Sequence, residues 1–162
     1  MQFLFQEEFT LEGVHLQDDL EARFERFCFV YPIQKLARSY AIELLQGTIR
    51  HLERIDALIR ESASNWRIER IALIDRNLLR IAVYEMLFSE DAPDQVVINE
   101  AVEIAKRYGT EDSAPFINGV LDAVRSVIRT GGEGRKGSIT AEIMEGGSDE
   151  VESPELDTLT KT

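Results

Sequence analysis

Apolar residues repeat at helical spacing throughout the first 130 positions of the chain. They recur every three or four residues, and no stretch shows a convincing two-residue alternation of the kind found in strands. The pattern therefore predicts an all-α protein. The helices expected from it cover residues 1–8, 20–31, 32–61, 73–88, 99–108 and a last segment that begins near Asp112 or Ser113, with a short helical turn at 68–71.

The segment 32–61 is the longest of these predicted helices. Its apolar positions form one wide face, and its charged residues lie mostly on the opposite side. Pro32 suits the first turn of a helix, because the N–H group that proline lacks has no partner there. We therefore expect one continuous helix from Pro32 onward.

The segment 73–88 differs from the others, because it is apolar nearly all round. From Leu78 to Phe88 only Arg80 and Glu85 are polar. Such a helix is expected in the middle of a bundle. An isolated carboxylate in an apolar environment costs several kcal/mol, so Glu85 must reach solvent, a paired cation or a partner protein. The residues alone leave these three alternatives open.

The composition changes after Thr130. The last 32 residues hold six of the ten glycines, no aromatic residue, three basic and eight acidic side chains. Such a segment buries too little apolar surface to offset its ordering entropy. This predicts one folded domain over residues 1–130 and a disordered acidic tail over 131–162. A solubilising terminus is favoured over a partner-binding arm.

The whole chain has a formal net charge of −12. This charge argues against a protein that coats nucleic acid nonspecifically, but a local basic patch remains compatible with it. A single cysteine, Cys28, is typical of a reducing compartment. No apolar run reaches the roughly 18 residues of a membrane span. The expected protein is cytoplasmic, without a membrane segment.

The sequence offers no positive sign of catalysis. The two histidines, His15 and His51, have no partners at metal-binding spacing, and Cys28 stands alone. No Gly-rich phosphate loop follows a strand, and no serine lies in a nucleophile motif. We expect no enzyme activity, no metal and no cofactor.

One segment carries features of a nucleic-acid surface. Lys106, Arg107 and Tyr108 end one predicted helix, and Phe116 opens the next, across a turn that begins at Gly109 in an expected left-handed conformation. Cations beside aromatic faces are what single-stranded RNA requires, for its phosphates and for its unpaired bases. By composition alone, the two rings are more often core residues. The helix dipole also favours cations at the C-terminal end of a helix, whether or not they bind RNA.

Two longer strings carry a family resemblance. Residues 75–88, DRNLLRIAVYEMLF, and residues 96–122, VVINEAVEIAKRYGTEDSAPFINGVLD, are similar to the NusB family of bacterial transcription antitermination factors. The resemblance covers about residues 1–129. It implies an all-α fold of seven helices in two packed three-helix units. It also implies binding of boxA-type single-stranded RNA together with the small-subunit ribosomal protein NusE, within the transcription elongation complex on ribosomal RNA operons, without catalysis or cofactor.

The resemblance also assigns roles to individual residues. Tyr108 and Phe116 match aromatic positions on the RNA-facing surface, with Lys106 and Arg107 beside them. Asp112 lies in the turn where the RNA affinity of the family is tuned, and Phe5 matches an aromatic residue of the first helix near the same surface. Glu85 matches the acidic residue that faces the ribosomal protein, which would explain a carboxylate on so apolar a helix.

One departure and two alternatives accompany the resemblance. Family members usually carry an Arg-rich segment ahead of their first helix, whereas this sequence starts inside that helix; if Met1 is the true start, weaker RNA binding is expected. An accessory domain of an RNA methyltransferase is one alternative, although no catalytic domain is visible after Arg129. A homodimeric helical interaction protein is the other.

Overall fold

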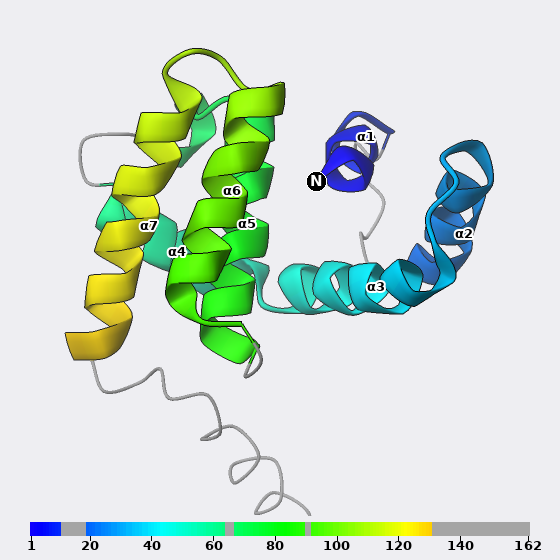
Figure 1. Cartoon of the computed structure of the whole chain (residues 1–162), viewed down its shortest axis with the longest axis horizontal. Coiled ribbons are helices and arrows are strands. Elements are labelled where there is room, and N and C mark those ends of the chain that lie inside the picture. Colours follow the sequence, from blue (N-terminus) through cyan, green and yellow to red (C-terminus); the bar gives the residue numbers. More distant parts are fainter. Residues whose placement is uncertain (11–18, 64–66, 90–91, 131–162) are drawn as a thin grey trace, which may run out of the picture.

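The computed structural model describes residues 1–10, 19–63, 67–89 and 92–130. Every regular element in this part of the chain is helical, which confirms the predicted all-α class (Figure 1). The elements are α1 (Gln2–Thr10), α2 (Leu20–Val30), α3 (Lys35–Arg50), α4 (Leu52–Ser62), the 3-10 turn η1 (Ile68–Arg70), α5 (Leu73–Phe88), α6 (Asp94–Tyr108) and α7 (Ser113–Thr130). The predicted disordered tail, 131–162, lies outside the described residues.

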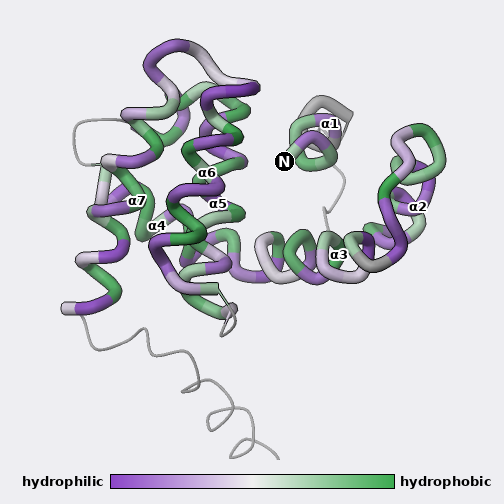
Figure 2. The backbone as a smooth tube through the Cα atoms, in the orientation of Figure 1, coloured by the Kyte–Doolittle hydropathy of each residue, from purple (hydrophilic) through white to green (hydrophobic). Residues whose placement is uncertain are grey.

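The helices form two units with separate cores. Helices α1, α2 and α3 surround a smaller cluster that includes Phe3, Phe24 and Leu45. Helices α4 to α7 surround a larger one, built on side chains such as Ile59 and Leu121. Green and purple stretches alternate along these helices in Figure 2, because each helix buries one apolar side. The arrangement confirms the expected fold of two packed helical units.

Helix α5 lies between the two units, as its apolar composition predicted. Leu79, Val83 and Met86 are buried in the larger core, whereas Ile81 packs against the smaller one. Helix α3 comes very close to α5 at Gly47, where an added Cβ would lie 2.0 Å from Cζ of Tyr84. A glycine is required there to let the two units pack together.

The prediction of one helix over residues 32–61 is wrong. The chain changes direction at His51, whose φ of −106° and ψ of 19° separate α3 from α4. Leu45 and Ile49 belong to the smaller core and Ile55 to the larger one, so the break lets one apolar stretch serve both units. Pro32 is also not in a first helical turn, because α3 begins at Lys35 after the chain has turned away from α2.

The helix expected over residues 99–108 begins five residues earlier than predicted, at Asp94. Pro93 precedes its first turn, where a missing N–H costs nothing. Val97 and Ile98 on the additional turn are buried in the larger core, so packing extends the helix beyond its most periodic part.

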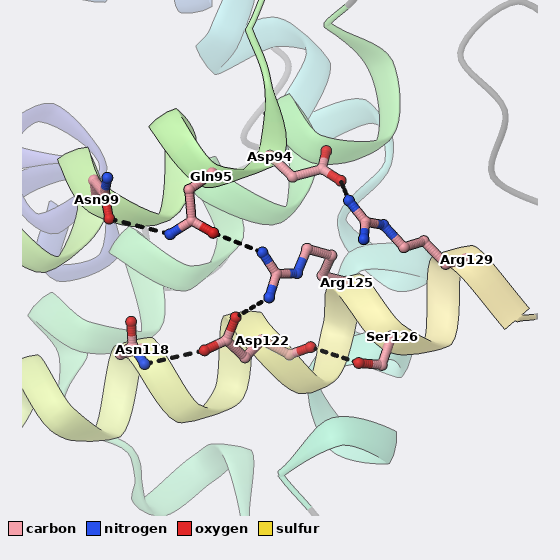
Figure 3. A network of polar contacts seen from close by, with 8 residues as sticks. All are labelled: Asp94, Gln95, Asn99, Asn118, Asp122, Arg125, Ser126 and Arg129. Atoms are coloured by element: carbon pink, nitrogen blue, oxygen red, sulfur yellow. Dashed lines mark hydrogen bonds and ion pairs between the residues drawn. The ribbon is translucent and has the colours of Figure 1, made fainter.

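Helices α6 and α7 are antiparallel and are held together at their open end by a polar network (Figure 3). Arg125 donates to Oε1 of Gln95 at 2.7 Å and forms an ion pair with Asp122 at 2.6 Å. Arg129 lies 3.6 Å from a carboxylate oxygen of Asp94. This network joins the start of α6 to the last turns of α7. At the opposite end of the pair, the short connection between residues 108 and 113 joins the two helices.

Candidate nucleic-acid and protein interface

The connection between α6 and α7 is a tight turn that begins at Gly109. The expected left-handed conformation of Gly109 is wrong, since its φ is −91° and its backbone is extended. The glycine is needed for space: an added Cβ would lie 2.5 Å from Cβ of Ser113 and 2.8 Å from the carbonyl oxygen of Ala105. Sequence alone identified the right residue for the wrong physical reason.

A buried network anchors this turn to α5. The hydroxyl of Ser113, which is fully buried, donates to Oδ2 of Asp75 at 2.9 Å. The Oγ atom of Ser113 in turn accepts a hydrogen bond from the backbone N–H of Thr110, also at 2.9 Å. The turn is thus tied to a helix 38 residues earlier in the chain. Sequence reasoning missed this pair, although an aspartate in the first turn of an apolar helix was a visible signal.

Gly109→Ala is expected to destabilise the protein by about 1–3 kcal/mol, because the new methyl group overlaps Ser113 and a backbone carbonyl that cannot move freely. Chemical denaturation measures the change. Gly119→Ala is the matched control, since nothing lies within 4 Å of the added Cβ and alanine favours a helix by about 0.5–1 kcal/mol over glycine. Equal and small effects of both substitutions would contradict the steric argument.

The expected RNA-binding residues surround this turn in two hollows. Phe5 and Tyr108 line one hollow of about 460 Å³, between α1 and the end of α6. Asp112 and Phe116 line a second of about 570 Å³, which also borders Asp75. Tyr108 is 44% exposed, whereas Phe116 is half-buried and packs against the larger core. The structure brings the four together in pairs, on the two sides of one turn.

The two expected cations lie on the last turn of α6. Lys106 and Arg107 are both exposed, and the ammonium group of Lys106 forms an ion pair with Glu103 at 2.6 Å. They follow Glu103 on a helix that ends at Tyr108, so their charge lies next to an exposed ring. This position also suits the negative end of the helix dipole, so the geometry is compatible with both interpretations of the sequence.

Glu85 lies on a different surface. Its side chain is half-buried and accepts a hydrogen bond from the hydroxyl of Tyr40 on α3, whose side chain is 49% exposed. Glu85 follows Asp75 by ten residues on α5, which is about 15 Å along the helix. The carboxylate therefore reaches the surface at the junction of the two units, away from the α6–α7 turn. Its tyrosine partner, 45 residues earlier, was not predicted.

Aromatic and basic side chains pack near this end of α5. The imidazole of His51 stacks on the ring of Phe88 at 4.4 Å, and the guanidinium of Arg54 lies 5.8 Å from the same ring. Burial, followed by the charges of Arg50 and Arg54, lowers the pKa of His51 below its ordinary value of 6.5. The imidazole is therefore neutral at pH 7, and the positive charge near this helix end comes from the arginines.

The described residues contain neither a metal-binding cluster nor a membrane-spanning helix. Within residues 1–10, 19–63, 67–89 and 92–130, no group of three His, Cys, Asp or Glu side chains could hold a metal ion. Over the same ranges, no helix is both long and apolar enough to span a bilayer.

Comparison with known proteins agrees with this arrangement. Residues 1–126 match the NusB family. The transcription antitermination protein NusB of Desulfotalea psychrophila is 49% identical over 127 residues, which cover 78% of this chain and 90% of that protein. The NusB protein of Desulfitobacterium hafniense is 44% identical over 124 residues, with 76% of this chain and 81% of that protein covered.

Solved structures show the same fold. NusB of T. maritima superposes with a TM-score of 0.67 at 41% identity, covering 77% of this chain and 84% of that one. A structure described as antitermination factors NusB and NusE in complex with dsRNA gives a TM-score of 0.64 at 30% identity, covering 77% and 90%. The relatives are named as transcription antitermination proteins, a family of non-enzymatic factors, in agreement with the expectation of no enzyme activity. Because the family matches residues 1–126, about three quarters of this chain, the chain belongs to the NusB family of transcription antitermination proteins.

Proposed function

We propose that this protein binds a boxA-type single-stranded RNA together with the small-subunit ribosomal protein NusE. The complex joins the transcription elongation complex and promotes read-through of ribosomal RNA operons by RNA polymerase. The observation that carries the proposal is the α6–α7 turn, where Phe5, Tyr108 and Phe116 line two hollows beside the exposed cations Lys106 and Arg107. A relative of the same fold crystallised with NusE and double-stranded RNA supports the binding of RNA together with NusE.

The RNA surface combines rings with few charges. Unpaired bases stack on aromatic side chains, and cations neutralise the flanking phosphates. Tyr108 offers an exposed ring, Phe116 a half-buried one, and Asp112 lies exposed in the turn between them. Because residues 1–130 carry a net charge of −7, long-range attraction of RNA is weak and binding depends on this local patch. A protein partner that adds positive charge is therefore expected to strengthen the RNA complex.

The protein surface is centred on Glu85. A half-buried carboxylate that already accepts a tyrosine hydroxyl still has lone pairs available to a donor from a partner. Charged groups of this kind fix orientation and partner choice more than they add affinity. We propose Glu85 as the group that faces NusE.

Binding of a fluorescent boxA-type RNA, measured by anisotropy with and without NusE, tests the proposal. We expect the 162-residue protein to bind the RNA, to bind it more tightly with NusE, and to lose affinity as salt is raised. A scrambled RNA of equal length and charge is the control. Absence of binding at low salt with NusE present would contradict the proposed function.

Arg107→Ala is expected to weaken RNA binding and to reduce the slope of log affinity against log salt by about one, since one phosphate contact is lost. Arg129→Ala is the matched control. Arg129 is also an exposed arginine near a helix C-terminus, but it lies at the far end of α7, beside Asp94. We expect its replacement to leave RNA affinity unchanged. An equal loss in both variants would indicate nonspecific attraction by net charge.

A further inference from the structure

The hollow beside Tyr108 contains two aromatic residues that the sequence did not point to. Besides Phe5 and Tyr108, it is lined by Phe27 on α2 and Tyr31 just after α2. Four rings from three parts of the chain therefore surround one cavity of about 460 Å³. These rings come from both helical units, so the cavity exists only when the units are packed together.

The rings are graded from buried to exposed. Phe5 and Phe27 are half-buried, whereas Tyr31 and Tyr108 are 53% and 44% exposed. The ring of Tyr31 packs on that of Phe27 with centroids 4.8 Å apart and planes tilted by 34°. The half-buried ring of Phe27 therefore holds the exposed ring of Tyr31 in position. The cavity is thus lined by two half-buried and two exposed aromatic rings.

The polar groups of the cavity suit a neutral, planar ligand. Among the described residues that line it, none is Asp, Glu, Lys, Arg or His. Gln2 and Gln6 line it and lie four residues apart on α1, so both are on the same side of that helix. A glutamine amide offers both donors and an acceptor, which matches the edge of a nucleobase.

We propose that this cavity, which we call the inter-unit pocket, holds a single unpaired base of the bound RNA, stacked between Tyr31 and Tyr108 and read at its edge by Gln2 and Gln6. This inference rests on the proposed function and adds a base subsite to it. The cations of α6 favour a nucleic acid over a protein partner as the occupant. Lys106 and Arg107 directly precede Tyr108 and can neutralise the phosphates on either side of the inserted base.

Tyr31→Leu tests the pocket in the 162-residue protein with NusE present. Leucine keeps apolar bulk but removes the ring, so we expect about tenfold weaker RNA binding, within the roughly 5- to 150-fold range that loss of one stacked base produces. Tyr31→Phe retains the ring and should bind like the wild type. Phe29→Leu is the matched control, because Phe29 is 89% exposed two residues away and does not line the pocket.

An abasic scan of the RNA identifies the inserted base. One abasic position should weaken binding to the wild type about tenfold, and the same position should cost little in Tyr31→Leu, because the two changes remove one contact. Gln6→Leu should reduce discrimination among the four bases at that position. Thermal melting of each variant reports whether the fold is kept.

The outcomes separate this inference from the proposed function. RNA binding by the wild type with equal affinities for Tyr31→Leu and Phe29→Leu would overturn the pocket and leave the proposed function in place. Additive effects of Tyr31→Leu and every abasic change would also overturn it. If Tyr31→Leu weakens binding of NusE in the absence of RNA, the pocket is a protein contact and the proposal is wrong. No RNA binding by the wild type would overturn both.

Discussion

Glu85→Lys is expected to weaken binding of NusE at least 100-fold while leaving the fold intact. The change replaces an acceptor with a cation at the surface where α3 and α5 meet, and like-charge contact or loss of a bonded carboxylate costs several kcal/mol at an interface. Glu85 is half-buried, so a long lysine side chain can reach solvent. The free energy of unfolding should therefore change by no more than about 1 kcal/mol. Titration calorimetry with NusE measures the effect.

Two variants separate the charge of Glu85 from its hydrogen bond. Glu85→Gln keeps an acceptor for the hydroxyl of Tyr40 but removes the charge, whereas Tyr40→Phe keeps the charge but removes the hydroxyl. If the charge faces the partner, Glu85→Gln should weaken NusE binding more than Tyr40→Phe. A large fall in melting temperature for Glu85→Lys, with NusE affinity unchanged, would show that Glu85 supports the fold instead.

Asp56→Ala is expected to lower the free energy of unfolding by about 3–5 kcal/mol. Asp56 on α4 and Arg80 on α5 form a bidentate pair, with Nε to Oδ1 at 2.9 Å and Nη2 to Oδ2 at 2.8 Å. Their side chains are only 11% and 13% exposed. Removing the carboxylate leaves a guanidinium with poor access to water, and that penalty exceeds the loss of the pair itself. Urea denaturation followed by circular dichroism measures it.

The controls for this pair are an exposed ion pair and a double substitution. Glu69→Ala removes a partner of Arg67 in a pair that is 67% and 76% exposed, and it should change stability by less than about 1 kcal/mol. Asp56→Leu combined with Arg80→Met replaces both charges with apolar groups and should recover much of the loss. The proposed cause of the loss is the buried guanidinium of Arg80 without its carboxylate partner. A double variant no more stable than Asp56→Ala would contradict this cause.

Local patterns in the sequence predicted the elements that one apolar face defines. Helix α5 spans the predicted residues 73–88, and the short turn predicted at residues 68–71 appears as η1. The last helix begins at Ser113, as expected from the residues before Pro115. In these segments, the periodicity of the sequence and the packing of the helix lead to the same boundaries. The roles of the expected RNA- and NusE-binding residues stay predictions.

The predictions failed where packing between units sets the local structure. The apolar pattern runs without interruption past His51, yet the helix breaks there because its two halves serve different cores. Gly109 was expected to adopt a left-handed conformation, whereas its space is limited by Ser113 and Ala105. Periodicity describes one helix at a time, and it contains no information about which neighbour a residue will meet.

The sequence by itself determined the helical class, the central position of α5, the family and the pairing of rings and cations around the α6–α7 turn. Only the tertiary structure decided that Tyr40 bonds Glu85, that Asp56 pairs with Arg80, and that Phe27 and Tyr31 complete the inter-unit pocket. The first set depends on spacing within a helix, which is written directly in the chain. The second joins residues from separate helices, 24 and 45 positions apart in the two polar pairs, and their meeting depends on how two packed units fix the helices relative to one another.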